Sequence, residues 1–177
     1  DESITSVTSV PPDETQNDTP NQAAFTTTRG QAIRSKIVTL SPQADRAGTA
    51  QAKALDWIVR GDEMELDASD PDLIQRYVVA VMYYSMGGDS WPFPGWLNGK
   101  RDECRFPGVV CNGQGRIHMI SLVSSGLTGN IPSEMSRLVD LKTLEFNDND
   151  ISGTVPMELG ELPHIEDLQL ADNDLQG

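Results

Sequence analysis

The sequence is short of the features that mark several large classes of protein. Positive charge is scarce: 13 Lys and Arg stand against 27 Asp and Glu, for a net charge of −14. Nucleic-acid binding needs clustered cations, so we expect no nucleic-acid partner, and the acidity favours high solubility or a cationic ligand. No apolar run approaches the roughly 20 residues of a membrane-spanning helix, so we expect no transmembrane segment within this chain.

Cysteine and histidine are equally scarce, which limits metal and catalytic chemistry. Cys104 and Cys111 cannot supply the four ligands of a structural zinc site, and His118 and His164 lie elsewhere. No nucleophile stands with a base and an orienting acid, so we expect no enzyme, no catalytic residue, no cofactor and no metal. The two cysteines are close enough in sequence to form a disulfide, which favours an oxidising compartment.

Large apolar residues are nearly absent from the first thirty positions, where only Ile4 and Phe25 exceed valine in size. Thr, Ser and Pro dominate instead, so we expect residues 1–33 to form a disordered or extended tail. A glycosylation sequon, Asn17-Asp18-Thr19, lies within it. Position 1 is Asp, so we expect a processed or trimmed front with any targeting segment outside this sequence.

Residues 34–115 carry two helical patterns and form the predicted N-terminal cap region. The first helix is expected to begin at Ser41-Pro42, with Ser as N-cap, and to end at Gly61. The second is expected to begin in the capping sequence 69–72 and to end at Gly87-Gly88. Because apolar residues cover more than half of its circumference, the second helix should be largely buried.

Two clusters in this region have alternative interpretations. The acidic run from Asp62 to Asp72 suggests calcium, but it lacks the glycine and closing glutamate of a calcium loop, so we expect a solvated loop with helix-capping roles. Aromatic residues between 89 and 111, including Trp91, Trp96 and Phe106, either line a ligand pocket or plug the open end of the neighbouring unit. We expect the plug.

Residues 116–177 repeat with a period of 24. The matched positions are Ile120, Leu144 and Leu168; Leu122, Phe146 and Leu170; Leu127, Ile151 and Leu175; Asn149 and Asn173; and Gly129, Gly153 and Gly177. Alternate residues point inward on a short strand, so Leu144 and Phe146 should be buried while Thr143 and Glu145 point out. The amides of Asn149 and Asn173 can satisfy backbone groups of adjacent turns. Stacked turns would leave a parallel sheet on a concave side.

At these residues the chain resembles leucine-rich-repeat proteins of the plant-specific type. Residues 138–161 follow that family's turn closely, and the segment from Trp96 to Cys111 resembles its N-terminal cap, with Phe106 in the aromatic place. Segments between residues 41 and 91 resemble the leucine-rich-repeat proteins of diatom algae. The resemblance implies an α/β solenoid of three turns behind a small helical, disulfide-containing cap. It also implies a non-catalytic, receptor-like binding protein at the cell surface or secreted.

The concave face is the expected site for a protein or glycan partner, one with a basic patch because the face is acidic. Its expected residues are Ser121, Thr143, Glu145, Asn147, Asp148, Asp167, Gln169 and Asp172. The residues with expected structural roles are Cys104, Cys111, Asn149, Asn173, Trp91 and Trp96. Two alternatives stay open: solvated strand positions without a partner, and a structural or adhesive subunit of a larger complex.

The last turn should expose its inward side chains Leu168, Leu170 and Leu175, because no capping sequence follows them. We therefore expect either further 24-residue turns or a partner over this end.

Overall fold

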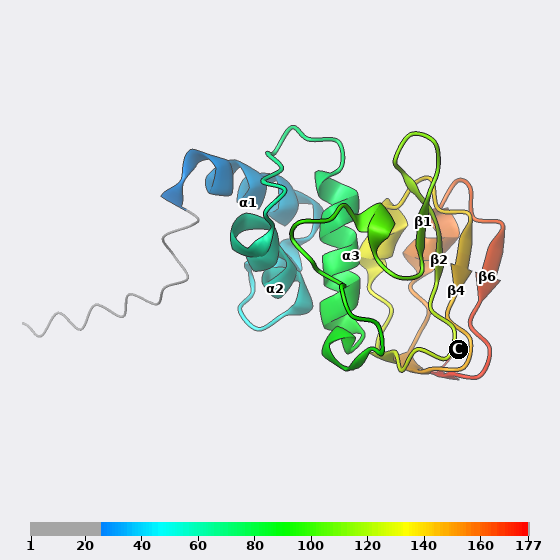
Figure 1. The fold of residues 1–177 in the computed structure, drawn as a ribbon. Coiled ribbons are helices and arrows are strands. Elements are labelled where there is room, and N and C mark those ends of the chain that lie inside the picture. The colour runs from blue at the N-terminus through cyan, green and yellow to red at the C-terminus, as the bar shows by residue number, and fades with distance from the viewer. Residues whose placement is uncertain (1–25, 177) are drawn as a thin grey trace, which may run out of the picture.

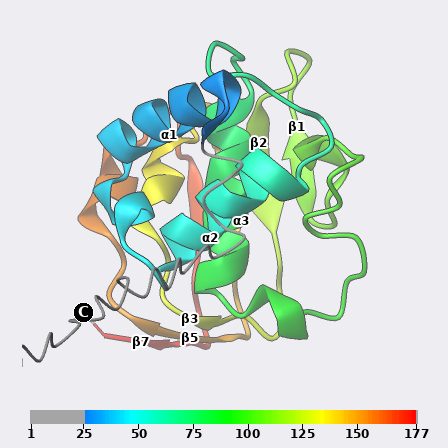
Figure 2. The same cartoon turned by 90° about the vertical axis from the view of Figure 1, so that its left-hand side faces the viewer.

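The computed structural model describes residues 26–176 and has two regions, helical and repetitive (Figure 1). The predictions for the tail before residue 26, including the Asn17 sequon, concern residues outside this described range. The longer helices are α1 (Thr28–Leu40), α2 (Ala50–Asp56, followed by a π-helical turn, Trp57–Gly61) and α3 (Leu73–Ser85). Figures 1 and 2 show α1 and α2 on one side of α3 and the strands on the other.

The strands form two ladders. They are β1 (Val109–Cys111), β2 (Ile117–Ser121), β3 (Thr128–Gly129), β4 (Thr143–Glu145), β5 (Asp150–Gly153), β6 (Asp167–Gln169) and β7 (Asp174–Leu175). One sheet has the order β1-β2-β4-β6 and the other the order β3-β5-β7. Short 3-10 helices complete the turns: η2 (Pro42–Asp45), η4 (Gly88–Ser90), η5 (Glu103–Arg105), η6 (Ser133–Arg137) and η7 (Met157–Glu161).

The pairing of β2, β4 and β6 has the predicted 24-residue register. Ile120 lies opposite Leu144, and Leu144 lies opposite Leu168, in parallel strands. The sheet is nevertheless mixed, because β1 runs antiparallel to β2. A tight turn joins the two strands, with the Asn112 N–H 2.7 Å from the Arg116 carbonyl oxygen, and so short a connection permits only antiparallel pairing. The strands of the repeats therefore pair in parallel as expected, and the antiparallel strand comes from the cap region, where no strand was predicted.

Side chains alternate across the sheet as the repeat predicts. Leu144 and Phe146 are fully buried, whereas Thr143 and Glu145 are only half-buried. Leu168 belongs to the same inward row but is 44% exposed, since no further turn covers it in this structure. Leu170 and Leu175 are half-buried. The inward row is therefore one continuous core from β2 to β4 that opens at β6.

The side-chain amide of Asn149 joins two turns. Its oxygen accepts hydrogen bonds from the backbone N–H groups of Ser125 (2.9 Å) and Leu127 (3.0 Å) in the preceding turn. Its nitrogen donates to the carbonyl oxygens of Leu122 and Phe146, both at 2.9 Å. Asn173 repeats the pattern one turn later, accepting from the Ile151 N–H at 3.0 Å. The predicted role of both amides is confirmed.

The helical region differs from its prediction at the start. α1 begins at Thr28, inside the segment 1–33 assigned to the tail, and the Thr27 hydroxyl caps it by accepting from the Gly30 N–H at 3.0 Å. Ile33 and Ile37, one turn apart, are fully buried against α2 and α3 residues. The low apolar content averaged over the tail concealed this single buried stripe.

The helix predicted to begin at Ser41-Pro42 begins at Ala50 instead. Ser41 terminates α1, and Pro42–Asp45 forms only one 3-10 turn. Gly48 has a left-handed φ of +84°, which breaks the helical path before Thr49 caps α2. The second helix is confirmed, with its start at Leu73 and a left-handed Gly87 after its end.

Arg76 of α3 is fully buried and lies at the centre of an ion-pair network. Its guanidinium donates twice to the Asp62 carboxylate, at 2.6 Å each, and once to Glu103 Oε2 at 3.1 Å. It also lies over the Trp57 ring, 5.1 Å from the centroid. The expectation of a solvated acidic loop is therefore wrong for Asp62, which is 5% exposed.

The helix-capping roles expected in that loop are wrong, because no side-chain hydrogen bond caps the start of α3, and the carboxylates stabilise turns before the helix instead. Asp67 accepts from the Ser69 N–H at 2.7 Å, and Asp70 accepts from the Asp72 N–H at 2.9 Å. The Ser69 hydrogen bonds lower the pKa of Asp67, because they stabilise its charged form.

The disulfide-containing cap closes the core next to β2. Cys104 and Cys111 are bonded, as predicted. Trp91, Trp96 and Phe106 are buried in the same core as the repeat residues, with ring centroids 4.8 Å apart for the two tryptophans. The plug interpretation is confirmed for these aromatic residues. Trp91 also donates from Nε1 to the Met86 carbonyl oxygen at 2.9 Å, which ties the cap to the end of α3.

We expect Asn149→Ala to lower the free energy of unfolding by at least about 2 kcal/mol, because it strands several buried backbone groups. Asn173→Ala is the matched control: it removes the same kind of amide, but Asn173 is half-buried and water can replace its hydrogen bonds. Urea unfolding of both variants measures the difference. Equal losses would contradict the buried-amide argument.

A second prediction concerns pH. Burial raises the pKa of Glu103 above its usual 4.5, although hydrogen bonds from Gln75 and Arg76 oppose the rise. The folded state then holds this proton more tightly than the unfolded state, so stability falls as pH rises through the folded-state pKa. Glu103→Gln should remove that fall. Urea unfolding between pH 4 and pH 8 measures the free energy of unfolding of both proteins. A difference in this free energy between variant and parent that did not change with pH would refute the prediction.

Candidate functional site

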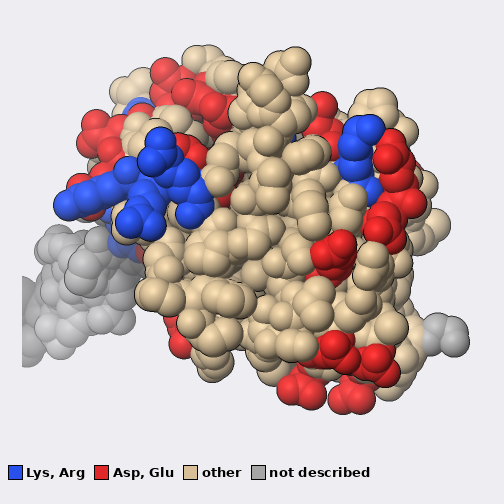
Figure 3. Space-filling model, turned by 45° about the vertical axis from the view of Figure 1, so that its right-hand side comes forward, with Lys and Arg blue, Asp and Glu red and all other residues tan. Residues whose placement is uncertain are grey.

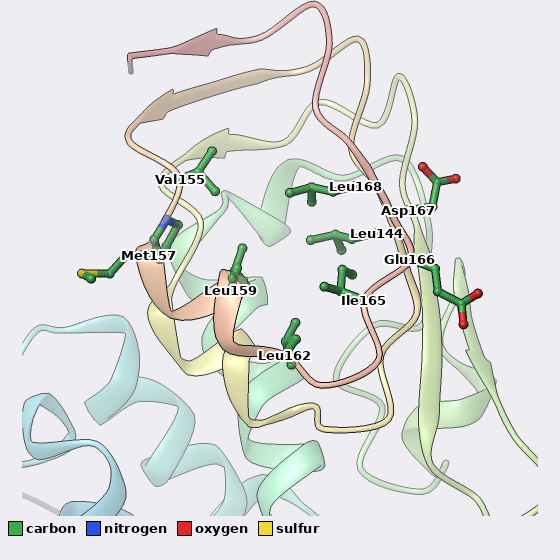
Figure 4. A pocket seen from close by; sticks show the side chains of 11 residues that line it. Leu144, Val155, Met157, Leu159, Leu162, Ile165, Glu166, Asp167 and Leu168 are labelled. Atoms are coloured by element: carbon green, nitrogen blue, oxygen red, sulfur yellow. The ribbon is translucent and has the colours of Figure 1, made fainter.

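The outward face of the sheet β1-β2-β4-β6 carries an ordered array of polar side chains. Two rows cross it in register: Met119, Thr143 and Asp167 in one, and Ser121, Glu145 and Gln169 in the other. Figure 4 shows the alternation directly, since Asp167 points away from the side of β6 on which Leu168 lies. Below, this surface is called the outward face.

Hydrogen bonds between turns fix several of these side chains. Ser121 Oγ donates to Glu145 Oε2 at 2.6 Å, and Asn147 Nδ2 donates to Gln169 Oε1 at 2.9 Å. Gln169 Nε2 in turn donates to Asp167 Oδ2 at 2.8 Å. The carboxylates of Glu145 and Asp167 are therefore held in place before any partner arrives, which lowers the entropy lost on binding.

A third row lies where each strand ends. Ser124, Asp148 and Asp172 are spaced by 24 residues and all have left-handed φ values, of 48°, 56° and 55°. Short polar residues such as Asp tolerate this conformation better than bulky ones. The row places the side chains of Asp148 and Asp172 in adjacent turns at one border of the outward face. The eight residues predicted for the concave site lie in β2, β4 and β6 or directly after β4 and β6.

Three apolar residues of the same surface were absent from the prediction. Val110 of β1 is 45% exposed, Val123 is 41% exposed, and Met119 is half-buried. The repeat contained the signal for two of them, because Met119 and Val123 precede Thr143 and Asn147 by one period. Val110 could not be placed from the sequence, since it reaches the sheet only through the antiparallel β1.

Charge is unevenly distributed over the outward face. The outward residues of the first turn are Met119, Ser121, Val123 and Ser124, and none of these four side chains is charged. The acidic members of the next two turns are Glu145, Asp148, Asp167 and Asp172. No ion pair within residues 26–176 involves these four. Figure 3 shows a broad uncharged area on this side of the molecule, with acidic side chains along its lower and right-hand borders.

Glu166, beside the outward face, differs from these four carboxylates because it has a cationic partner. Its Oε1 lies 2.7 Å from Lys142 Nζ, and this hydrogen bond and charge lower the pKa of Glu166. Lys142 thus pairs with Glu166, and the ion pairs of residues 26–176 give it no partner among the four face carboxylates.

The two histidines lie in different turns. His118 is half-buried, with Nδ1 3.2 Å from the Val110 carbonyl oxygen, and His164 is exposed in another turn. Within the described part of the chain, no three His, Cys, Asp or Glu residues are grouped to hold a metal ion. No helix in that part is long and apolar enough to cross a membrane.

A second candidate surface lies at the last turn. A hollow of about 440 Å³ is lined mainly by apolar residues of β4, η7 and β6. In Figure 4, Leu144, Leu159, Leu162 and Leu168 point into it, while Met157 points away. Met157 is 82% exposed.

No protein-family model and no curated protein matches the chain. Several solved structures are similar to part of it. A chain from the BIR3–SERK2 complex of Arabidopsis thaliana is 32% identical, with a TM-score of 0.41, covering 49% of this chain and 47% of that one. The BIR2 ectodomain from the same plant is 33% identical, with a TM-score of 0.40, covering 49% and 46%.

The third comparison is the leucine-rich-repeat ectodomain of the Arabidopsis receptor kinase HAESA in complex with a peptide hormone. It is 26% identical, with a TM-score of 0.40, and the match covers 43% of this chain and 13% of that one. The match therefore spans about half the length of the first two chains and a small part of the third. The 24-residue register of the strands and the asparagine ladder are observed in this chain itself and do not rest on these matches.

We expect Asp172→Asn to raise the free energy of unfolding by about 0.2–1 kcal/mol at low salt, because it removes a like charge beside Asp148. Asparagine tolerates the left-handed backbone at this position. Glu166→Gln is the control, and it should not raise stability because it breaks the pair with Lys142. Urea unfolding in low and high salt distinguishes them. A gain for Asp172→Asn that persists in 1 M salt would contradict the electrostatic cause.

Proposed function

We propose that this protein is a non-catalytic recognition module that binds another protein through its outward face. The observation that carries the proposal is the unpaired charge there: Glu145, Asp148, Asp167 and Asp172 share one exposed surface and have no cationic partner within residues 26–176. A partner with a basic patch would relieve their mutual repulsion and would associate in a salt-sensitive way.

A protein partner is favoured over a glycan. Trp91 and Trp96 are buried in the core, and the outward positions of the three turns carry no aromatic side chain. No ring is thus available on the face for stacking on a sugar. Uncharged side chains and fixed carboxylates instead match the mixture of apolar and polar contacts that protein interfaces use.

The proposed setting is the cell surface, the extracellular space or another oxidising lumen. The Cys104–Cys111 bond supports it, since disulfides persist in oxidising compartments. The same proposal includes a solenoid of three turns with further turns beyond it. It also includes a glycan at Asn17 and kinship with the leucine-rich-repeat proteins of diatom algae.

The test is affinity capture from the extracellular fraction of the source, followed by a measured dissociation constant for each captured protein. The double charge reversal Glu145→Lys with Asp167→Lys should weaken the specific partner at least about tenfold. The control reversal Glu158→Lys with Glu161→Lys makes the same charge change on η7, in a different layer, and should leave affinity within about twofold. Equal weakening by both variants would overturn the proposed site.

An assembly role is the second candidate, favoured by the apolar hollow at the last turn. Met157→Glu changes an exposed side chain beside it without touching the core. If the hollow holds the protein in a larger complex, this variant should dissociate the native complex in sedimentation, while the face reversal leaves it intact. The opposite result favours recognition by the outward face.

A further inference from the structure

A cavity between the helical region and the first turn combines two arginines, one aspartate and an apolar wall. It has a volume of about 250 Å³ and is lined by residues at the start of α3, at the start of β2 and directly after η6. None of these residues belongs to the outward face. We propose that this cavity is a binding site for a free α-amino acid with an apolar side chain.

Hydrogen bonds hold the walls of the cavity in place. Gln75 of α3 accepts at Oε1 from the Ile117 N–H at 3.3 Å, which joins α3 to the start of β2. On the other side, the turn 138–141 is closed by a hydrogen bond of 2.8 Å from its last N–H to its first carbonyl oxygen. Val139 and Asp140 are the central residues of this turn. The cavity is therefore formed before a ligand arrives, which lowers the entropy lost on binding.

Two arginines offer hydrogen-bond donors to a carboxylate. Arg116 uses Nη1 within the protein, donating to the Pro71 carbonyl oxygen and to Asp72 Oδ1, each at 2.9 Å. Among residues 26–176 no hydrogen bond engages its Nε or Nη2. Arg137 is exposed, and within the same residues its side chain has neither a hydrogen bond nor an ion pair. Guanidinium groups bind carboxylates through paired, charge-assisted hydrogen bonds.

The opposite charge and the apolar wall come from the neighbouring residues. The Asp140 carboxylate lines the cavity and has no ion-pair partner in the described part of the chain, so it can accept from an ammonium group. Ile74, Leu138 and Val139 form the apolar wall. Val139 is 55% exposed, so a ligand side chain that covers it removes apolar surface from water.

This set of groups selects one class of ligand. A simple carboxylate leaves Asp140 unpaired, and a simple amine leaves both arginines unpaired. A residue inside a polypeptide lacks both charges, and a terminal residue lacks one of them. A free amino acid carries both charges and a side chain in a molecule that fits a cavity with room for roughly eight waters. Its zero net charge also avoids repulsion by a protein of net charge −14.

The combination is specific to the junction with the helical region. One period later the chain carries Glu161, Pro163 and His164 in place of the arginine, valine and aspartate after η6. The next turn therefore lacks both the cation and the carboxylate of the proposed site, and the repeat pattern alone does not produce it.

The probe is L-leucine, titrated into the full chain and followed by calorimetry and by backbone NMR shifts. Three analogues each lack one feature: isocaproate lacks the ammonium group, isopentylamine lacks the carboxylate, and glycine lacks the side chain. We expect a dissociation constant of about 1 mM or less for leucine. Each analogue should bind at least about tenfold more weakly, because it leaves a group of the cavity without its partner.

Two variants test the charged groups. Arg137→Gln breaks no side-chain hydrogen bond of residues 26–176 and should weaken leucine about tenfold without weakening isopentylamine. Asp140→Asn should abolish the preference for leucine over isocaproate. The matched control is Arg101→Gln, which changes another exposed arginine outside the cavity and should leave leucine binding as in the parent.

Far-UV circular dichroism and an unchanged urea midpoint establish that each variant is folded. Equal leucine affinities of the Arg137→Gln and Arg101→Gln variants overturn the site, as do leucine-induced NMR shifts that leave residues 137–141 unchanged. An analogue that binds as well as leucine overturns the ligand class, and no saturation by about 10 mM leucine overturns both. None of these outcomes bears on the outward face, which the charge reversal at Glu145 and Asp167 decides.

Discussion

The amide of Asn149 is the contact on which the repeated half of the molecule depends. A short turn leaves buried backbone N–H and C=O groups that no strand partner reaches, and such groups are costly unless they are hydrogen-bonded. Asn149 satisfies groups in its own turn and in the turn before it. The 24-residue period thereby becomes a fixed distance between strands, and the outward face inherits its register from it.

The helical region completes the stack at the other end. α3 packs against η6, and the chain directly after α3 lies close to β3, where a Cβ on Gly87 would be 2.4 Å from Thr128 Oγ1. Two buried polar networks hold it there. One is centred on Arg76, and in the other Ser41 Oγ donates to Glu134 Oε1 at 2.6 Å while accepting from the Tyr77 hydroxyl. Burial and the neighbouring Glu134 charge raise the pKa of Tyr77, so this hydroxyl stays protonated.

The outward face follows from these constraints. Because inward positions must be apolar and outward positions need not be, the turns could differ in charge without disturbing the core. The cap adds β1 beside β2, which brings Val110 next to Met119. A gradient from apolar to acidic therefore runs across strands that the asparagine ladder holds in register, and this gradient motivates the proposed partner.

The sequence by itself determined the elements governed by local period and spacing. The register of Ile120, Leu144 and Leu168, the inward and outward alternation, both ladder asparagines, α3 and the Cys104–Cys111 bond all follow from patterns within one turn or one loop. Tertiary structure decided the rest. Glu134 and Glu158 occupy the same place in the repeat, yet only Glu134 is buried against the helical region. Asp62, one residue of an acidic run, is the ion-pair partner of the buried Arg76. Ion pairs and edge strands depend on which distant segments meet in space, and the repeat period does not specify that.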